Sequence, residues 1–318
     1  GRGGRACRGP SEVQFHPFMN ASMLSLPVRF VVAAALLSTG LAAESGQGAA
    51  DSNSAARMGS AAEAFLGSLT AAQRQQTVFP KDDPERRNWS NLPHTLYPRK
   101  GISMGELSAE QRIKAHHLLQ SGLSSQGYLK TSGIMQLDEV LLHLSGQDKA
   151  EKPMFGLKYY WISFLGEPSA TQPWGWQLDG HHLALNFSVV GSGVAVTPTF
   201  MGSDPHEVRD GLHAGWRVLG AEDDQGLALM RALRPDQQKK ALIGTEAPAD
   251  VLAGAGKDNV RPPVEGIPFG ELDDAQKIRL MRLVDEYVRN YAADLAVGQL
   301  DRINRAGWDK VTFAWAGP

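Results

Sequence analysis

The spacing of hydrophobic positions changes twice along residues 58–318 of this 318-residue chain. It is helical at first, becomes an alternation between residues 157 and 200, and is helical again until a last extended stretch at 311–315. Apolar residues three and four positions apart form one stripe on a helix, whereas alternate residues share one face of a strand. The order of elements therefore predicts an α+β fold, a single domain in which helices pack on a mainly antiparallel sheet.

Two helical stretches carry apolar stripes that predict a buried face. The stripe of the first helix comprises Ile134, Leu137, Leu141 and Leu144. The stripe of the second, longer stretch comprises Ile278, Met281, Val284, Val288, Tyr291 and Leu295. We expect both stripes to face the core.

A short motif, leucine followed four positions later by glutamine, occurs at four predicted helix starts. In three of them Thr70, Ser108 or Asp273 precedes the glutamine by three residues, so that its side chain can cap the first amides while the glutamine reaches back. In the fourth, Pro235 takes the favoured first helical position. The spacings between motifs, 38, 126 and 39 residues, define no solenoid period, so we interpret them as helix starts rather than a repeat of ligand sites.

The alternating region predicts a strand around residues 159–164, one strand over 177–190 and another over 194–200. Two glycines between the last two strands predict a hairpin turn. Along the 177–190 strand, Asp179 and His181 share a face that becomes apolar further on. We therefore expect a pocket at the polar end of this strand.

Asp179, His181 and the adjacent His182 are the candidates for catalysis and for metal binding. On one side of a strand, a carboxylate and an imidazole can share a divalent ion such as zinc, iron or manganese, or the carboxylate can orient the imidazole as a base. Cys7 is the sole cysteine, so any metal needs His, Asp or Glu ligands. The alternative is that one histidine packs in the core and the other is solvated. The sequence leaves both possibilities open.

Trp174 and Trp176 stand just before this segment and are candidates, with Asn186, for lining a substrate cleft. Indole rings stack on sugars and other flat ligands at the rim of a pocket. The alternative is that both tryptophans are core residues around a turn that Gly175 loosens.

His213 and Arg217 lie in a glycine-rich segment before a predicted helix that begins near Glu222. Imidazole and guanidinium groups bind anionic parts of a substrate. The alternative is a surface ion pair between Arg217 and Glu222 or Asp223.

Composition narrows the function classes. The 32 basic residues nearly balance the 34 acidic ones, which leaves a formal net charge of −2 and no field that would hold nucleic acid. The chain has no GxSxG elbow, no P-loop and no GxGxxG after a strand. Serine-hydrolase and nucleotide-binding functions are therefore disfavoured, and the expected partner is a small-molecule substrate or ligand.

The N-terminal residues predict export. Residues 1–18 show no periodicity and are interpreted as an untranslated or disordered leader. Residues 19–43 combine a basic flank, a short apolar core and small residues, which is typical of a signal peptide, and residues 44–57 are a small, polar linker. The apolar core is too short to span a bilayer. We expect a periplasmic or extracellular protein with no stable membrane span after cleavage.

Several motifs together resemble a known family. They include Trp89-Ser90-Asn91-Leu92-Pro93, Trp174-Gly175-Trp176-Gln177, Gly180-His181-His182-Leu183 and Gly215-Trp216-Arg217-Val218-Leu219. Because of these motifs, the segment 58–318 resembles the bacterial and fungal "domain of unknown function 3500" family. The resemblance implies export but neither a reaction nor a substrate. It also implies a further segment, rich in His, Asp and Arg, after residue 317, so that the domain at 58–318 is expected to be incomplete at its C-terminus.

Two functions follow as hypotheses. The first is an exported metal-dependent enzyme, hydrolytic or oxidative, with a His/carboxylate site on a strand. The second is a non-catalytic exported protein that binds a small ligand or carbohydrate through its tryptophans.

Overall fold

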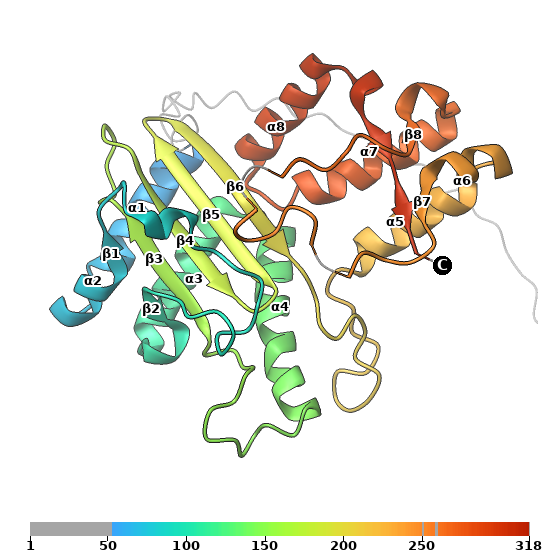
Figure 1. The fold of residues 1–318 in the computed structure, drawn as a ribbon. Coiled ribbons are helices and arrows are strands. Elements are labelled where there is room, and N and C mark those ends of the chain that lie inside the picture. Colours follow the sequence, from blue (N-terminus) through green and yellow to red (C-terminus); the bar gives the residue numbers. More distant parts are fainter. Residues whose placement is uncertain (1–52, 250, 258–259, 318) are drawn as a thin grey trace, which may run out of the picture. The chain divides into compact units, whose positions relative to one another are not determined.

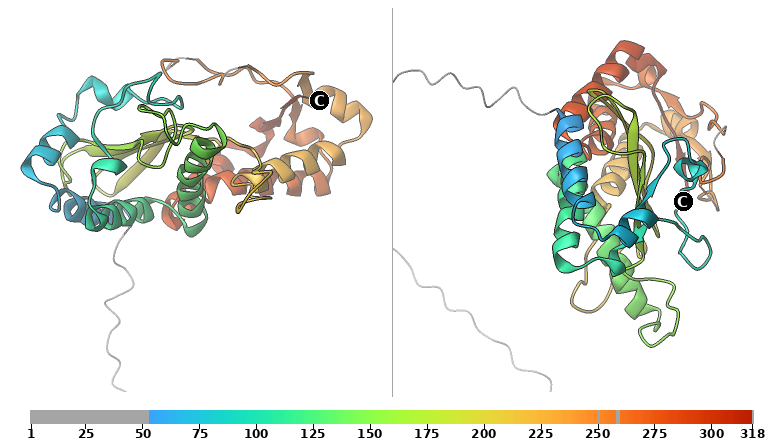
Figure 2. Two further views of the ribbon diagram at one scale, coloured as in Figure 1. Left: turned by 90° about the horizontal axis from the view of Figure 1, so that it is seen from below. Right: turned by 90° about the vertical axis from the view of Figure 1, so that its left-hand side faces the viewer.

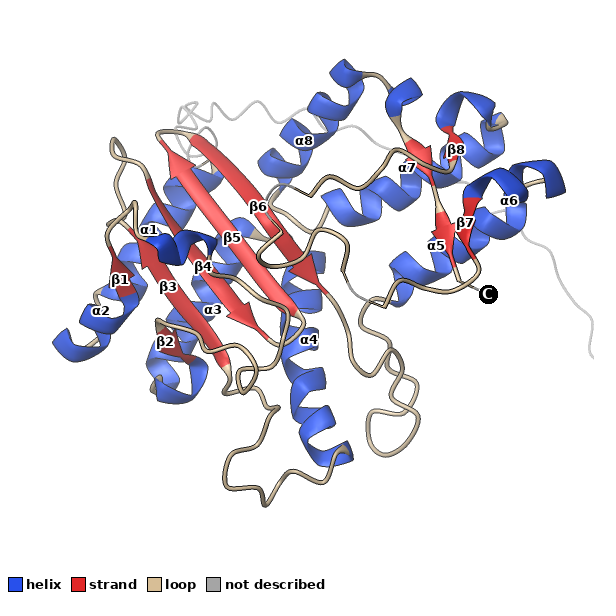
Figure 3. Ribbon diagram, viewed as in Figure 1, coloured by secondary structure: helices blue, strands red, loops and turns tan. Residues whose placement is uncertain are grey.

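A six-stranded sheet lies at the centre of residues 78–201 (Figures 1 and 3). This computed structural model describes residues 53–249, 251–257 and 260–317. The long strands are antiparallel neighbours in chain order, namely β3 (Tyr160–Leu165), β4 (Trp174–Gly180), β5 (Leu183–Val190) and β6 (Gly193–Met201). Two short strands flank β3, namely β1 (Val78–Phe79) in parallel and β2 (Ile102–Ser103) antiparallel. The predicted α+β fold with a mainly antiparallel sheet is confirmed.

Helices cover one face of this sheet and an irregular segment covers the other (Figure 2). Trp176 and Phe187 point toward α1 (Ser54–Leu66) and α3 (Ala109–Gly122), where they join one apolar cluster. The opposite face is polar and is covered by residues 80–100, which include the 3₁₀ turn η1 (Pro84–Arg87). Two more helices complete this part, namely α2 (Ala71–Thr77) and α4 (Ser125–Leu144).

The prediction of one strand over residues 177–190 is wrong. The chain reverses at His181 and His182, and Gly180 pairs with Leu183 across this two-residue turn. The reversal changes which residues share a face, because partners across a hairpin lie on the same side of the sheet. Trp176 therefore lies beside Phe187, and the face of Asp179 is not the face of the apolar β5 residues. The predicted hairpin turn between the last two strands is found at Gly191, whose φ of 57° favours glycine in this tight turn.

Residues 220–316 contain further helices and short strands. Helices α5 (Gly220–Ala232), α6 (Pro235–Ala241), α7 (Asp274–Val288) and α8 (Ala293–Ala306) surround two small sheets. One sheet pairs β7 (Leu242–Gly244) with β10 (Trp315–Ala316) in parallel. The other pairs β8 (Ile267–Pro268) with β9 (Thr312–Phe313) antiparallel.

The architecture of residues 54–165 recurs in residues 220–316, and we call these segments the first and second repeats. In both, a 13-residue helix precedes a 7-residue helix and a short strand, and a second short strand leads through a 3₁₀ turn into a longer helix. The pairing also recurs, since β1 is parallel to β3 as β7 is to β10, and β2 is antiparallel to β3 as β8 is to β9. Gly101 and Gly266 occupy equivalent positions in the two repeats. A β-carbon on Gly101 would lie 2.3 Å from the Ile162 carbonyl oxygen, and one on Gly266 would lie 2.2 Å from the Phe313 carbonyl oxygen.

The four predicted helix starts are confirmed, and they associate in two pairs. Gln73 and Gln111 exchange side-chain hydrogen bonds in the first repeat, and Gln237 and Gln276 do so in the second. Each glutamine also accepts the backbone amide of its own N-cap residue, as the capping-box pattern predicts. The motif therefore builds the same junction twice.

The two apolar stripes are only partly buried. Ile134 and Leu137 lie in the core, but Leu144 is exposed near the end of α4. In α7 the buried residues are Gln276, Leu280 and Val288, whereas Ile278 is 51% exposed and Met281 41% exposed. The long stripe does not form one buried face, because α7 ends at Val288. The apolar side chains of α7 contact α5 on one side and α8 on the other.

The repeats contact each other where α3 meets α4 and α7 meets α8. Leu123 and Tyr291, each directly before the N-cap residue of the following helix, form an isolated antiparallel bridge. Nearby, the buried Lys130 ammonium binds Glu222 at 2.7 Å and Glu286 at 2.6 Å. Among the described helices, none combines the length and apolarity needed to cross a membrane.

Candidate functional site

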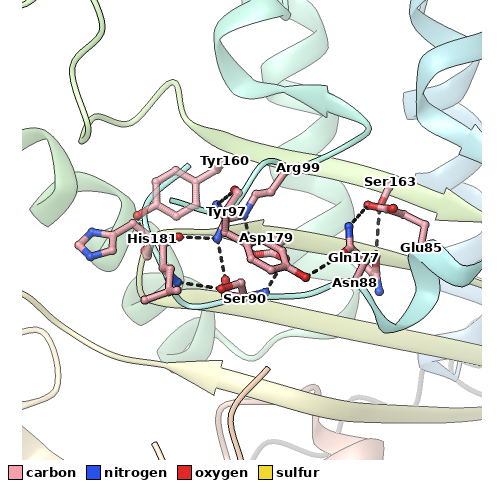
Figure 4. Close-up of polar contacts among 11 residues, drawn as sticks. Glu85, Asn88, Ser90, Tyr97, Arg99, Tyr160, Ser163, Gln177, Asp179 and His181 are labelled. Atoms are coloured by element: carbon pink, nitrogen blue, oxygen red, sulfur yellow. Dashed lines mark hydrogen bonds and ion pairs between the residues drawn. The ribbon is translucent and has the colours of Figure 1, made fainter. Parts of the chain in front are cut away.

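A buried ion pair organises the polar face of the sheet (Figure 4). Arg99 Nε donates to Asp179 Oδ1 at 2.8 Å, and the Ser90 amide donates to Asp179 Oδ2 at 3.0 Å. The Arg99 guanidinium also donates to the Ser90 and Leu92 carbonyl oxygens. Burial raises the pKa of Asp179 to about 7, against the opposing effects of Arg99 and Ser90. Both carboxylate oxygens of Asp179 are thus engaged in holding residues 90–99 on the sheet.

His181 binds a different carboxylate from the one that its sequence position suggested. Its Nδ1 lies 2.7 Å from Asp138 Oδ1, and both side chains are buried. Asp138 comes from the middle of α4, and its other oxygen accepts the Gly156 amide. Sequence reasoning missed Asp138, although a carboxylate directly after Leu137 of the apolar stripe was a signal for a buried acid. The structure thus forms a His–Asp pair without Asp179.

His182 occupies a strained position in the β4–β5 turn. Its φ of 57° lies in the left-handed region, which residues other than glycine adopt rarely. Its amide donates to Asn91 and its carbonyl accepts from Gly202, while its ring stacks on that of His181 at 4.0 Å. Burial, and then the neighbouring His181, lower the pKa of His182 to about 4. The His182 imidazole is therefore neutral at physiological pH.

A metal centre is not assembled by the predicted ligands. Within residues 53–249, 251–257 and 260–317, no group of three or more His, Cys, Asp or Glu side chains is placed to hold a metal ion. The expected zinc, iron or manganese ion thus stays a prediction.

The two predicted cleft tryptophans belong to the core. Trp176 is fully buried and stacks on Phe187 with ring centroids 4.5 Å apart. Trp174 stacks on Phe164, and its Nε1 donates to the Ser169 carbonyl oxygen at 3.1 Å. Neither indole presents an open face on which a sugar could stack.

A small cavity on the polar face of the sheet does include two of the predicted residues, Trp174 and Asn186. We call this cavity of about 170 Å³ the polar groove. Its polar lining combines strand residues with the covering segment, namely Lys81, Asp82, Arg86, Gln177, Asn186, Ser188 and Thr197. The sheet register brings them together, since Gln177 pairs with Asn186 across β4 and β5.

Asn186 is the buried polar group of this groove whose hydrogen bonding is incomplete. Its Nδ2 donates to the Pro198 carbonyl oxygen at 2.7 Å. Its Oδ1 is buried and has no hydrogen-bond partner within the described part of the chain. Gln177, by contrast, donates to the Arg86 carbonyl oxygen and accepts from Ser163. A buried acceptor without a donor is costly, so Asn186 Oδ1 is the polar atom of the groove lining that lacks a donor.

His213 and Arg217 lie outside the polar groove. Arg217 forms ion pairs with Asp223 and Asp224, as the surface alternative predicted for Asp223. His213 is exposed, with its ring centroid 5.5 Å from that of Trp216. The basic groups that do reach the groove, Lys81 and Arg86, were not among the predicted residues, because nothing in their local sequence distinguishes them from other surface cations.

Comparison with known proteins gives one result. No curated protein and no solved structure matches the chain. A family model described as "Protein of unknown function (DUF3500)" matches residues 51–318. The chain therefore belongs to the DUF3500 family, as its tryptophan, glycine and histidine motifs indicated.

Proposed function

We propose that this is an exported binding protein whose polar groove takes a small polyhydroxylated ligand with an acidic group, such as a sugar acid. The observation that carries the proposal is the buried, unpartnered Asn186 Oδ1 in the wall of the groove. An unpartnered acceptor favours a ligand hydroxyl, which can donate to it.

The cationic rim supports the acidic part of the ligand. Arg86 is exposed beside the groove, and the described residues place no carboxylate within ion-pair distance of it. A guanidinium that is exposed and pairs with no carboxylate of the protein can bind a ligand carboxylate, which it matches in charge and shape. Ser188 and Thr197 add hydroxyl groups that both donate and accept.

The size of the groove supports a small ligand. Its 170 Å³ falls below the roughly 300–1,000 Å³ of drug-sized pockets, so a single sugar ring is a better match than an oligosaccharide. Export is supported by the sequence pattern at residues 19–43, which lies outside the described residues.

Isothermal titration calorimetry with D-galacturonate, D-glucuronate and D-glucose tests this proposal. We expect one of the two acids to bind and glucose to bind at least tenfold more weakly. Arg86→Gln should weaken binding of the acid at least tenfold, because a hydrogen bond to a charged group contributes about 1.5–3 kcal/mol.

Arg87→Gln is the matched control, since Arg87 is an exposed neighbour that does not line the groove. It should bind the acid as the unmodified chain does. Equal affinity for glucose and the acids, or equal effects of the two arginine variants, would refute a groove that recognises acidic sugars.

A second candidate, an enzyme that uses His181 as a base, is favoured by the 2.7 Å contact between His181 and Asp138. A buried carboxylate fixes the tautomer and orientation of an imidazole for proton transfer. It ranks second because His181 is not among the residues that line the polar groove.

Hydrolysis of p-nitrophenyl acetate, with the metal content measured on the same sample, tests the second candidate. We expect His181→Gln to abolish any turnover and the exposed His213→Gln to leave it unchanged. Turnover that survives in His181→Gln would eliminate His181 as the base.

A further inference from the structure

The second repeat has an open, largely apolar groove where the first repeat has a filled core. A cavity of about 590 Å³ extends between α5, α7 and the strands β9 and β10. We call this cavity the strand groove. Its apolar lining comprises Leu219, Gly226, Leu280, Leu283, Val284, Tyr287, Val311, Phe313, Ala314 and Trp315, and its polar lining comprises Ser203, His206, Glu222, Asp223 and Thr312.

The wall residues of the strand groove on α7 have counterparts on α3 of the first repeat. Counting from the equivalent glutamines Gln111 and Gln276, Leu283 corresponds to Leu118, and Val284 to Leu119. Leu118 and Leu119 are fully buried, whereas their counterparts are only partly buried.

The cover over the first repeat is the β4–β5 hairpin. Phe187 of β5 packs directly on α3, because a β-carbon on Gly122 would lie 2.7 Å from its ring. Trp176 and Leu178 of β4 belong to the same apolar cluster as Leu118 and Leu119. The second repeat contains no such hairpin among its described residues, and each of its two sheets there has two strands.

A strand edge is also unpaired beside the strand groove. In the first repeat β3 is bordered by β1 and β2 on one edge and by β4 on the other. In the second, β7 and β8 provide the first border, and no described strand provides the second. Unpaired backbone groups next to partly exposed apolar side chains are the features by which an extended polypeptide docks on a sheet.

We propose that the strand groove binds a β-hairpin of polypeptide that the described residues do not supply. Its first strand pairs antiparallel with Thr312–Ala316, as β4 pairs with β3, and its apolar side chains cover Leu283 and Val284. The internal repeat, which provides the filled version of the same groove, identifies the kind of occupant.

One position of the strand groove carries a larger side chain than its counterpart in the first repeat, and this difference predicts a smaller residue in the bound hairpin. Tyr287 corresponds to Gly122 and is 57% exposed. The second repeat therefore has a phenol side chain at the position where the first repeat has no side chain and Phe187 packs. The hairpin bound by the second repeat therefore needs a small residue where β5 has Phe187.

Synthetic peptides that copy residues 172–190 test this proposal by fluorescence anisotropy. A peptide with Phe187→Ala should bind the 318-residue chain at least tenfold more tightly than the unmodified peptide. The preference should reverse for the chain variant Tyr287→Gly, which restores the room present in the first repeat.

Gly226→Leu should block binding, because a β-carbon there points into the groove at an ordinary 3.6 Å from the Trp315 ring. Gly59→Leu, on the equivalent helix α1, is the control: a β-carbon there meets no described atom within 4 Å, and binding should persist. The proposal is overturned if neither peptide binds either chain, or if Gly226→Leu binds normally. It is also overturned if sedimentation shows a dimer that Gly226→Leu dissociates, since a second copy would then be the occupant.

Discussion

His182 is a residue whose conformation and charge state are both set by the turn between β4 and β5. The left-handed backbone is held by hydrogen bonds to Asn91 and Gly202, and the ring is buried against His181. Because burial disfavours the imidazolium, the folded protein binds a proton at this site less readily than the unfolded chain does.

Stability should therefore fall in acid through His182. The pKa is about 4 in the fold and about 6.5 in the unfolded chain, so this contribution is complete above pH 6.5 and is lost as the pH falls toward 4. Between pH 7 and pH 5 the linkage amounts to about 2 kcal/mol. His182→Asn keeps a residue that tolerates positive φ but cannot titrate, and should remove this part of the pH dependence.

Urea unfolding at pH 7 and pH 5 measures the effect, with the exposed His213→Asn as control. We expect the control to keep the pH dependence of the unmodified chain. If His182→Asn keeps it as well, His182 is not the group that loses a proton on folding.

The two glutamine pairs are the elements that join each short helix to the longer helix of its repeat. Gln276 accepts the Asp273 amide at 3.0 Å and donates to the Ala232 carbonyl oxygen at 2.9 Å and to Gln237 at 2.8 Å. One buried side chain thus satisfies the ends of three helices. Such residues are costly to replace, because the groups that remain have no water to bind.

Gln276→Leu should lower the free energy of unfolding by at least about 2 kcal/mol, since it leaves a carbonyl and an amide group unsatisfied. Gln111→Leu should lower it by a similar amount, because it makes the equivalent bonds to Ser108, Ser68 and Gln73. Gln120→Leu, exposed on α3, should change it by less than about 0.5 kcal/mol. Chemical denaturation of the three variants checks the ranking, and equal effects in all three would remove the structural role of the pairs.

At the scale of the whole molecule, the two repeats are joined by a close contact of their backbones. Gly127, near the start of α4, lies against the backbone of Asn290 between α7 and α8. The adjacent bridge between Leu123 and Tyr291 and the buried Lys130 ion pairs cross the same contact. A backbone approach this close admits only glycine at position 127.

Gly127→Ala should destabilise the protein by about 1–3 kcal/mol or more, because its β-carbon would lie 1.8 Å from the Asn290 carbonyl oxygen. The same substitution at Gly59, in the open on α1, should stabilise by about 0.5–1 kcal/mol through helix propensity. Thermal unfolding of both variants measures the difference in sign. If both variants are stabilised, the repeats are not in tight contact at Gly127.

The internal repeat has a signature in the sequence. The segments Gly101–Gln111 and Gly266–Gln276 share Gly, Ile, Gly, Glu, Leu and Gln at equal offsets, and the two motif spacings of 38 and 39 residues are almost equal. The motifs follow no constant period, because the β4–β6 strands and their flanking loops separate the two copies.

Local sequence by itself determined the helix starts, the Gly191 turn, the strand-forming character of residues 159–200 and the family. Each depends on residues within a few positions of one another, such as a cap and its glutamine, or on motifs that a family model matches. Tertiary structure alone decided which carboxylate binds His181, that Trp176 is core, and that Asn186 faces a groove. These outcomes depend on partners 43 residues away in sequence, as in Asp138 and His181, and on a two-residue turn that exchanges the faces of a strand. Local pattern carries no information about such distant partners, because burial and pairing are properties of the folded chain.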